Sequence, residues 1–301
     1  MTDKSRRRIF AVAAVVLGFA VALGALEASL RATATAYSAM VRTPPETFQD
    51  GDDIKILCVG DSYTFGTGAD GPDSYPDQLQ RRLAPVVAPR SVKVINWGLP
   101  AQNSSEALLA VKSFYEDEPI PPDVLIVAIG VNDYWNHHLS VALSAGGNPL
   151  AELDSAVHGL RVFRLAKIML GRGPIRAGKF YAKPDPEEAK DANLTSFRDN
   201  HSELFAAALT RNLSAMAELA KTHGTRMILL GYPDNGPDVD NAYAAVSDRY
   251  DIPLVVTRGF GRPAKEREAL LSEDGWHPNA KGYTYVVDQV TPVVRKVLSP
   301  N

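Results

Sequence analysis

Five short, continuous apolar runs constrain the fold of this chain more than any other feature. They are rich in Val, Ile and Leu without polar alternation, which is typical of parallel strands buried on both faces. The runs are Ile54–Val59, Val92–Ile95, Val124–Ile129, Met227–Leu230 and Pro253–Val256. Helical patterns lie between or after them, at a segment that begins at Ser74 and at Ser105–Tyr115, Leu160–Leu170, His201–Thr222, Asn241–Tyr250 and Asn279–Leu298. This alternation predicts an α/β fold, a doubly wound five-stranded parallel sheet.

The composition is that of an ordinary globular protein. Of the 301 residues, 45% are hydrophobic and 22% are charged, and the net charge is −3. With no basic excess, we expect no nucleic-acid partner. Cys58 is the one cysteine, which excludes an intrachain disulfide and a cysteine-based zinc site.

The N-terminus has the pattern of an export signal or a membrane anchor. Three arginines, Arg6 to Arg8, precede an uncharged run over residues 9–26. A helix of that length spans about 27 Å, close to the ~30 Å core of a bilayer. We therefore expect a single transmembrane helix with a cytoplasmic N-terminus and the rest of the chain periplasmic or extracellular. The alternative is a signal cleaved near Ala32-Thr33-Ala34, which would give a secreted protein.

This interpretation divides the chain into three parts. Residues 1–30 form the anchor or signal, residues 31–53 a polar stalk, and residues 54–301 a single domain with an insert at about 136–200.

Polar, glycine-containing segments follow three of the predicted strands, and a fourth follows the fifth strand at some distance. The carboxyl ends of parallel strands meet at one edge of a sheet, where ligands bind in folds of this class. We therefore expect a functional site at this edge. The segments are Gly60-Asp61-Ser62, Asn96-Trp97-Gly98, Gly130-Val131-Asn132-Asp133 and Asp274-Gly275-Trp276-His277-Pro278.

Together these segments contain the groups that nucleophilic catalysis needs. Ser62 is a weak nucleophile unless a base takes its proton, and His277 is a candidate base with Asp274 three residues before it. The backbone N–H groups of Ser62 and Gly98 and the side-chain amide of Asn132 are candidate donors to an oxyanion. The alternative interpretations are a capping serine, a surface histidine, turn residues at Asp274 and Asn132, and a turn glycine.

The four segments, in this order, resemble the sequence blocks of the SGNH/GDSL hydrolase family. The resemblance implies a flavodoxin-like three-layer α/β/α sandwich. It also implies Ser62 as nucleophile, Asp274 and His277 as the other members of a triad, and an oxyanion hole at Ser62, Gly98 and Asn132. One residue departs from the family pattern, because Tyr63 stands where leucine usually follows the serine.

The expected function is therefore that of an exported serine esterase. It would hydrolyse O-acyl or O-acetyl groups of small-molecule or glycan esters, through an acyl-enzyme, in the cell envelope or outside the cell. We expect no cofactor or metal. An O-acyltransferase with a sugar hydroxyl as acceptor is the first alternative, because it needs the same triad, and a catalytically idle glycan-binding subunit is the second. Acyl length and oligomeric state cannot be read from the sequence.

Overall fold

The computed structural model describes residues 3–41, 47–51, 53–69, 71–134, 160–162, 192–233 and 237–299. The chain forms two compact units, one of residues 1–45 with 149–174 and the other of residues 46–148 with 175–301. Most of the predicted insert, including nearly all of the predicted helix Leu160–Leu170, lies outside the described residues.

The first unit contains one long helix, α1 (Asp3–Val41), which extends beyond the predicted anchor into the segment expected to be a stalk. Its Glu27 carboxylate accepts a hydrogen bond from the Val162 N–H at 3.0 Å. Among the helices formed by described residues, none combines the length and apolar character needed to cross a bilayer. The predicted membrane-spanning segment at residues 9–26 is therefore not supported.

The second unit is built on a five-stranded parallel sheet, which confirms the predicted fold class. The strand order is β2-β1-β3-β4-β5, the flavodoxin-like order. At the carboxyl edge, Gly60 of β1 lies opposite Gly98 of β2 and Ala128 of β3. The strands are β1 (Ile54–Gly60), β2 (Val92–Gly98), β3 (Val124–Ala128), β4 (Arg226–Leu230) and β5 (Leu254–Val255).

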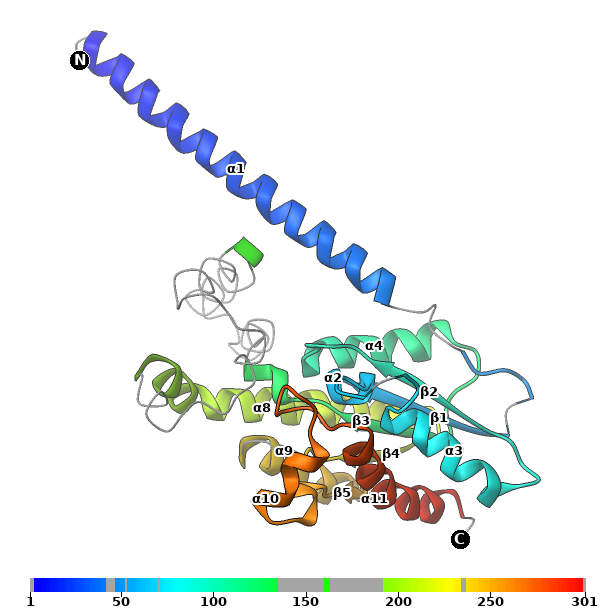
Figure 1. Ribbon diagram of the computed structural model, residues 1–301. Helices are drawn as coiled ribbons and strands as arrows, with labels where there is room; N and C mark the ends of the chain where they lie inside the picture. Colours follow the sequence, from blue (N-terminus) through cyan, green and yellow to red (C-terminus); the bar gives the residue numbers. More distant parts are fainter. Residues whose placement is uncertain are drawn as a thin grey trace. The chain divides into compact units, whose positions relative to one another are not determined.

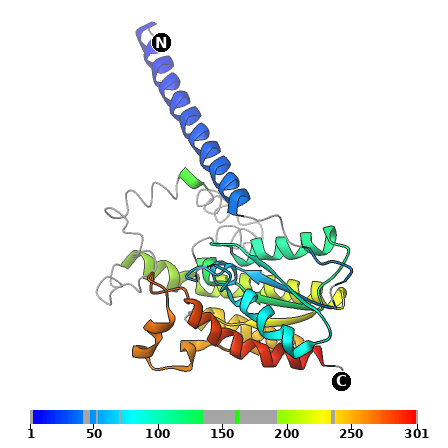
Figure 2. The same cartoon turned by 45° about the vertical axis from the view of Figure 1, so that its right-hand side comes forward.

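Helices cover both faces of this sheet (Figures 1 and 2). One face packs against α3 (Tyr75–Val87) and α11 (Ala280–Leu298), which lie side by side. The other packs against α4 (Ser104–Asp117), α8 (Ala192–Thr222) and α9 (Pro237–Tyr250). Because successive strand residues point to opposite faces, β1 sends Leu57 to one core and Cys58 to the other. Cys58 is fully buried, and this burial raises the pKa of its thiol.

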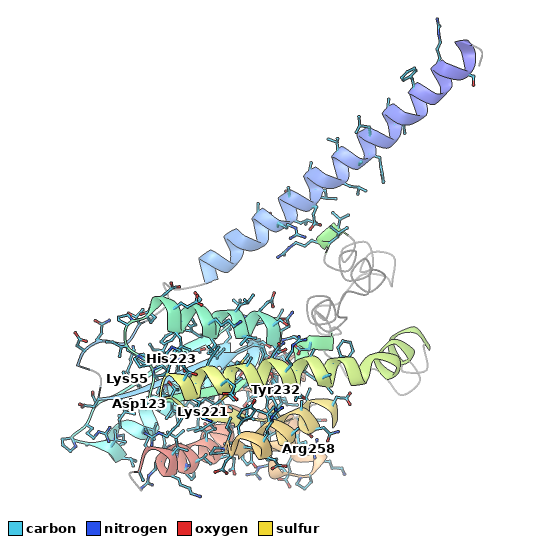
Figure 3. All side chains as sticks on the ribbon, turned by 180° about the vertical axis from the view of Figure 1, so that it is seen from behind. Lys55, Asp123, Lys221, His223, Tyr232 and Arg258 are labelled. Atoms are coloured by element: carbon cyan, nitrogen blue, oxygen red, sulfur yellow. The ribbon has the colours of Figure 1, made fainter. Side chains whose placement is uncertain are left out.

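Short helices form the connections around the carboxyl edge. They are α2 (Ser62–Phe65), η1 (Val131–Tyr134), η4 (Arg258–Gly261), α10 (Ala264–Arg267) and η5 (Glu268–Leu270). The opposite edge carries an ion pair between Lys55 and Asp123, with the nitrogen and oxygen 3.4 Å apart. Figure 3 shows this pair toward one end of the sheet and Tyr232, which follows β4, toward the other. The predicted site residues all belong to the edge on the Tyr232 side.

Candidate active site

Ser62 stands at a sharp turn between a strand and a single helical turn. It is the first residue of α2, one residue after Asp61, whose carboxylate caps the helix by accepting the Tyr63 N–H at 3.0 Å. At the other end of α2, the Gly66 N–H donates to the Ser62 carbonyl at 3.1 Å. This geometry fixes the backbone of Ser62, and the residue is half-buried at the carboxyl edge.

The turn that carries His277 is organised by one carboxylate. The Oδ1 atom of Asp274 accepts hydrogen bonds from the Ser272 hydroxyl at 2.7 Å, the Trp276 N–H at 2.8 Å and the His277 N–H at 2.9 Å. Gly275 supplies the φ of 70° that the turn requires, a conformation that favours glycine. Burial of the Asp274 carboxyl acts to raise its pKa, but these bonds and the one to the His277 ring outweigh burial and lower the pKa to about 2.

The last helix begins slightly later than its sequence suggests. Asn279 is the N-cap of α11, and its Oδ1 accepts the N–H groups of the next turn. Pro278 directly precedes the cap and pairs with Leu271 in an isolated bridge. The bridge holds the His277 turn against the preceding segment.

The structure brings together the three side chains predicted to form a triad. The His277 Nδ1 atom lies 2.6 Å from Asp274 Oδ2, and its Nε2 atom lies 2.8 Å from Ser62 Oγ. An ionised carboxylate only accepts, so Nδ1 carries the hydrogen and Nε2 is left to accept the Ser62 O–H. The histidine is 3% exposed, so water has little access to this bond. The arrangement can move a proton from the serine to the imidazole.

The predicted oxyanion donors differ in how they are engaged. Within the described part of the chain, no acceptor is found for the Ser62 N–H. Asn132 donates one amide hydrogen to the Gln102 carbonyl at 3.2 Å, which leaves the other for a ligand. The Gly98 N–H donates to the Asn96 side chain at 2.9 Å, so an oxyanion would compete with Asn96 for it. The oxyanion roles of all three residues stay predictions.

Two fully buried carboxyls support the loops of the site. Burial raises the pKa of Asp61 to about 7, although the carboxylate accepts a 2.6 Å hydrogen bond from the Tyr232 hydroxyl. Burial likewise raises the pKa of Asp133 to about 6, and this carboxylate accepts the Ser104 N–H at 2.7 Å. Asp133 thereby joins the loop after β3 to the first turn of α4.

Sequence reasoning missed several of these supporting contacts. Nothing in the sequence pattern pointed to Tyr232 as the partner of Asp61, because 171 residues separate them. Ser272 lies two residues before Asp274 and donates to its carboxylate. This partner could have been proposed from the sequence, because serine side chains often bond to nearby groups in turns. Among the described residues, no three His, Cys, Asp or Glu side chains lie together as metal ligands would. The expectation of no cofactor stays a prediction.

The parallel sheet and the hydrogen-bonded serine, histidine and aspartate at its carboxyl edge define an α/β serine hydrolase. The chain belongs to the GDSL-like Lipase/Acylhydrolase family, whose model matches residues 58–285, and it is a serine ester hydrolase. The family resemblance seen in the sequence motifs is confirmed.

Solved structures of similar fold include that of TesA, with 19% sequence identity, 81% of this chain and 99% of that chain covered, and a TM-score of 0.50. This likeness shows the fold alone. The esterase EstA from Pseudoalteromonas sp., solved with monoethylphosphonate as inhibitor, has 15% sequence identity, with 82% of this chain and 99% of that chain covered and a TM-score of 0.49. The lipase/acylhydrolase from Enterococcus faecalis has 18% sequence identity, with 82% of this chain and 98% of that chain covered and a TM-score of 0.49. No curated protein matches the chain in sequence.

Proposed function

We propose that the protein hydrolyses O-acyl esters through an acyl-enzyme on Ser62, with His277 as general base and acid and Asp274 as the group that orients it. The observation that carries this proposal is the continuous hydrogen-bonded path from Ser62 Oγ through the His277 ring to Asp274. Each group in the path has the partner that its role requires.

The reaction follows from the positions of the protons. His277 Nε2 takes the hydroxyl proton as Ser62 Oγ bonds to the ester carbonyl carbon. The imidazolium then gives this proton to the leaving alcohol as the C–O ester bond breaks. Water attacks the acyl-enzyme, again losing a proton to His277, and the carboxylic acid leaves as Ser62 regains its proton.

Charge that develops on the carbonyl oxygen needs donors that are already in place. The Ser62 N–H and the second amide hydrogen of Asn132 fit this need, because neither is engaged by an acceptor in the described part of the chain. Gly98 is the third proposed donor, on condition that its N–H leaves Asn96 when the substrate binds.

We propose esters of envelope or extracellular glycans, O-acetyl esters in particular, as the substrate class. The support is the N-terminal pattern of three arginines before an uncharged run at residues 9–26, which is typical of exported chains. Fractionation of cells that express the full chain, with mass spectrometry of the mature N-terminus, tests the location. Recovery of the uncleaved chain in the cytoplasm would contradict it.

Replacement of the nucleophile tests the chemistry. We expect Ser62→Ala to abolish hydrolysis of p-nitrophenyl acetate and to leave the thermal unfolding midpoint close to that of the wild type. An organophosphonate should label the wild-type protein at Ser62 and leave the variant unlabelled. Ester turnover by Ser62→Ala at the wild-type rate would refute the proposal.

Incubation of the enzyme with an acetyl donor and a glycan acceptor, followed by analysis of the products, distinguishes hydrolysis from transfer. We expect free acetate as the product, because water completes the reaction of an esterase. Accumulation of acetylated glycan in place of acetate would instead identify an O-acyltransferase that uses the same acyl-enzyme.

A further inference from the structure

Tyr63, the residue after Ser62, is hydrogen-bonded to the residue before His277. Its hydroxyl donates to the Trp276 carbonyl at 2.9 Å, across 213 residues of sequence. Both partners are one peptide unit away from a member of the proposed triad. This bond therefore joins the turn that carries the serine to the turn that carries the histidine.

The Tyr63 ring also contacts the histidine directly. The centroids of the Tyr63 and His277 rings are 5.5 Å apart, with an interplanar angle of 47°. Tyr63 is 4% exposed, so the ring is a buried surface against which the imidazole packs. Tyr63 thus contacts a member of the proposed triad through its ring, and the residue beside that member through its hydroxyl.

Other contacts fix Tyr63 itself. The Tyr232 ring meets it edge-on, with centroids 4.8 Å apart and an interplanar angle of 84°. The Tyr232 hydroxyl donates to Asp61 Oδ2 at 2.6 Å, and Asp61 Oδ1 accepts the backbone N–H of Tyr63 at 3.0 Å. The Tyr63 side chain is thus held at its backbone, its ring and its hydroxyl, which leaves it little rotamer freedom.

We propose that Tyr63 is a positioning residue, which sets the distance and orientation of His277 relative to Ser62. The inference rests on the proposed function, because it assumes that proton transfer between these residues limits the reaction. A leucine, the residue usual at this position in the family, can pack there but cannot donate to the Trp276 carbonyl. Tyrosine adds a bond that resists separation of the two turns.

The test is Tyr63→Phe, which removes the hydroxyl and keeps the ring. With p-nitrophenyl acetate we expect kcat to fall about tenfold, equivalent to ~1.4 kcal/mol of barrier, with KM unchanged. The rate of inactivation by an organophosphonate should fall in parallel, because it reports attack by Ser62 without the later steps. Tyr63→Leu should lose at least as much of both rates.

Thr225→Val is the matched control for the loss of a buried hydroxyl. The Thr225 hydroxyl donates to the Pro122 carbonyl at 2.8 Å, a bond of the same kind at the opposite edge of the sheet. Its loss should lower the unfolding midpoint and leave kcat unchanged, so a general effect of instability can be separated from a positional one. All rates are measured well below the unfolding temperature of each variant.

Wild-type kcat and inactivation rate in Tyr63→Phe would overturn the inference, as would an equal loss of kcat in Thr225→Val. Failure of the proposed function looks different, because Ser62→Ala would then remain active and the organophosphonate would not label Ser62. An inactive Ser62→Ala together with a fully active Tyr63→Phe contradicts the positioning role alone.

Discussion

The proposed role of Asp274 depends on the charge of a single carboxyl group. It accepts hydrogen bonds from Ser272, Trp276 and His277, and its pKa of about 2 keeps it ionised wherever an esterase is assayed. A charged acceptor beside Nδ1 selects the tautomer in which Nε2 faces Ser62 without a hydrogen. The charge, more than the shape, of this side chain therefore decides whether His277 can act as a base.

Asp274→Asn separates charge from shape. The asparagine oxygen can still accept from the turn, but an amide N–H beside Nδ1 favours the opposite tautomer, with a hydrogen on Nε2. We expect kcat for p-nitrophenyl acetate to fall on the order of 10³–10⁴-fold. Glu273→Gln, an exposed neutralisation one residue earlier, should keep wild-type kcat. A loss of less than tenfold in Asp274→Asn would indicate that Ser62 and His277 suffice as a dyad.

At the scale of elements, local pattern predicted the strands and most of the helices. Apolar runs place the strands to within a few residues, and the helical segment predicted to begin at Ser74 is α3, with Ser74 as its N-cap. Contacts between distant residues have no such local signal, so the bonds from Tyr63 to Trp276 and from Tyr232 to Asp61 could not be anticipated. The packing of these side chains is determined only when segments that are far apart in the sequence come together in the folded chain.

Gly98 is a second case in which the sequence did not reveal a contact between distant residues. From the sequence we expect its N–H to face an oxyanion, and in the structure its backbone also lies against α2. A Cβ atom at Gly98 would lie 2.0 Å from the Phe65 nitrogen and 2.5 Å from the Thr64 carbonyl carbon. A glycine looks identical in sequence whether it makes room for a substrate or for a helix.

Gly98→Ala distinguishes these two reasons. Because backbone atoms cannot yield as a flexible side chain can, the new methyl group should displace α2 and with it Ser62. We expect a loss of about 1–3 kcal/mol in the free energy of unfolding, together with a fall in kcat. Gly51→Ala is the control, since nothing lies within 4 Å of a Cβ atom there. An unchanged unfolding midpoint in Gly98→Ala would contradict packing against α2 and favour a purely ligand-facing role.

For the whole molecule, buried carboxyls make the stability depend on pH. The raised pKa values of Asp61, about 7, and Asp133, about 6, mean that the folded state binds these protons more tightly than the unfolded state. Their contribution to stability is complete below about pH 4, the ordinary range for aspartate, and is lost as the pH rises through 6 to 7. Asp274 acts in the opposite sense, because its contribution is present above about pH 4 and is lost toward pH 2.

Asp133→Asn tests this dependence away from the proposed nucleophile. The asparagine oxygen can still accept the Ser104 N–H, and the side chain no longer titrates. Between pH 5 and pH 8 the free energy of unfolding of the wild type should therefore fall more steeply than that of the variant, by on the order of 1–3 kcal/mol over the range. The measurement is urea unfolding at a series of pH values. Asp288→Asn, which removes a carboxyl that pairs with Arg82 at the surface, should keep the wild-type slope. Parallel stability curves for the wild type and Asp133→Asn would show that the buried carboxyl keeps its ordinary pKa and that burial in this loop does not hold its proton.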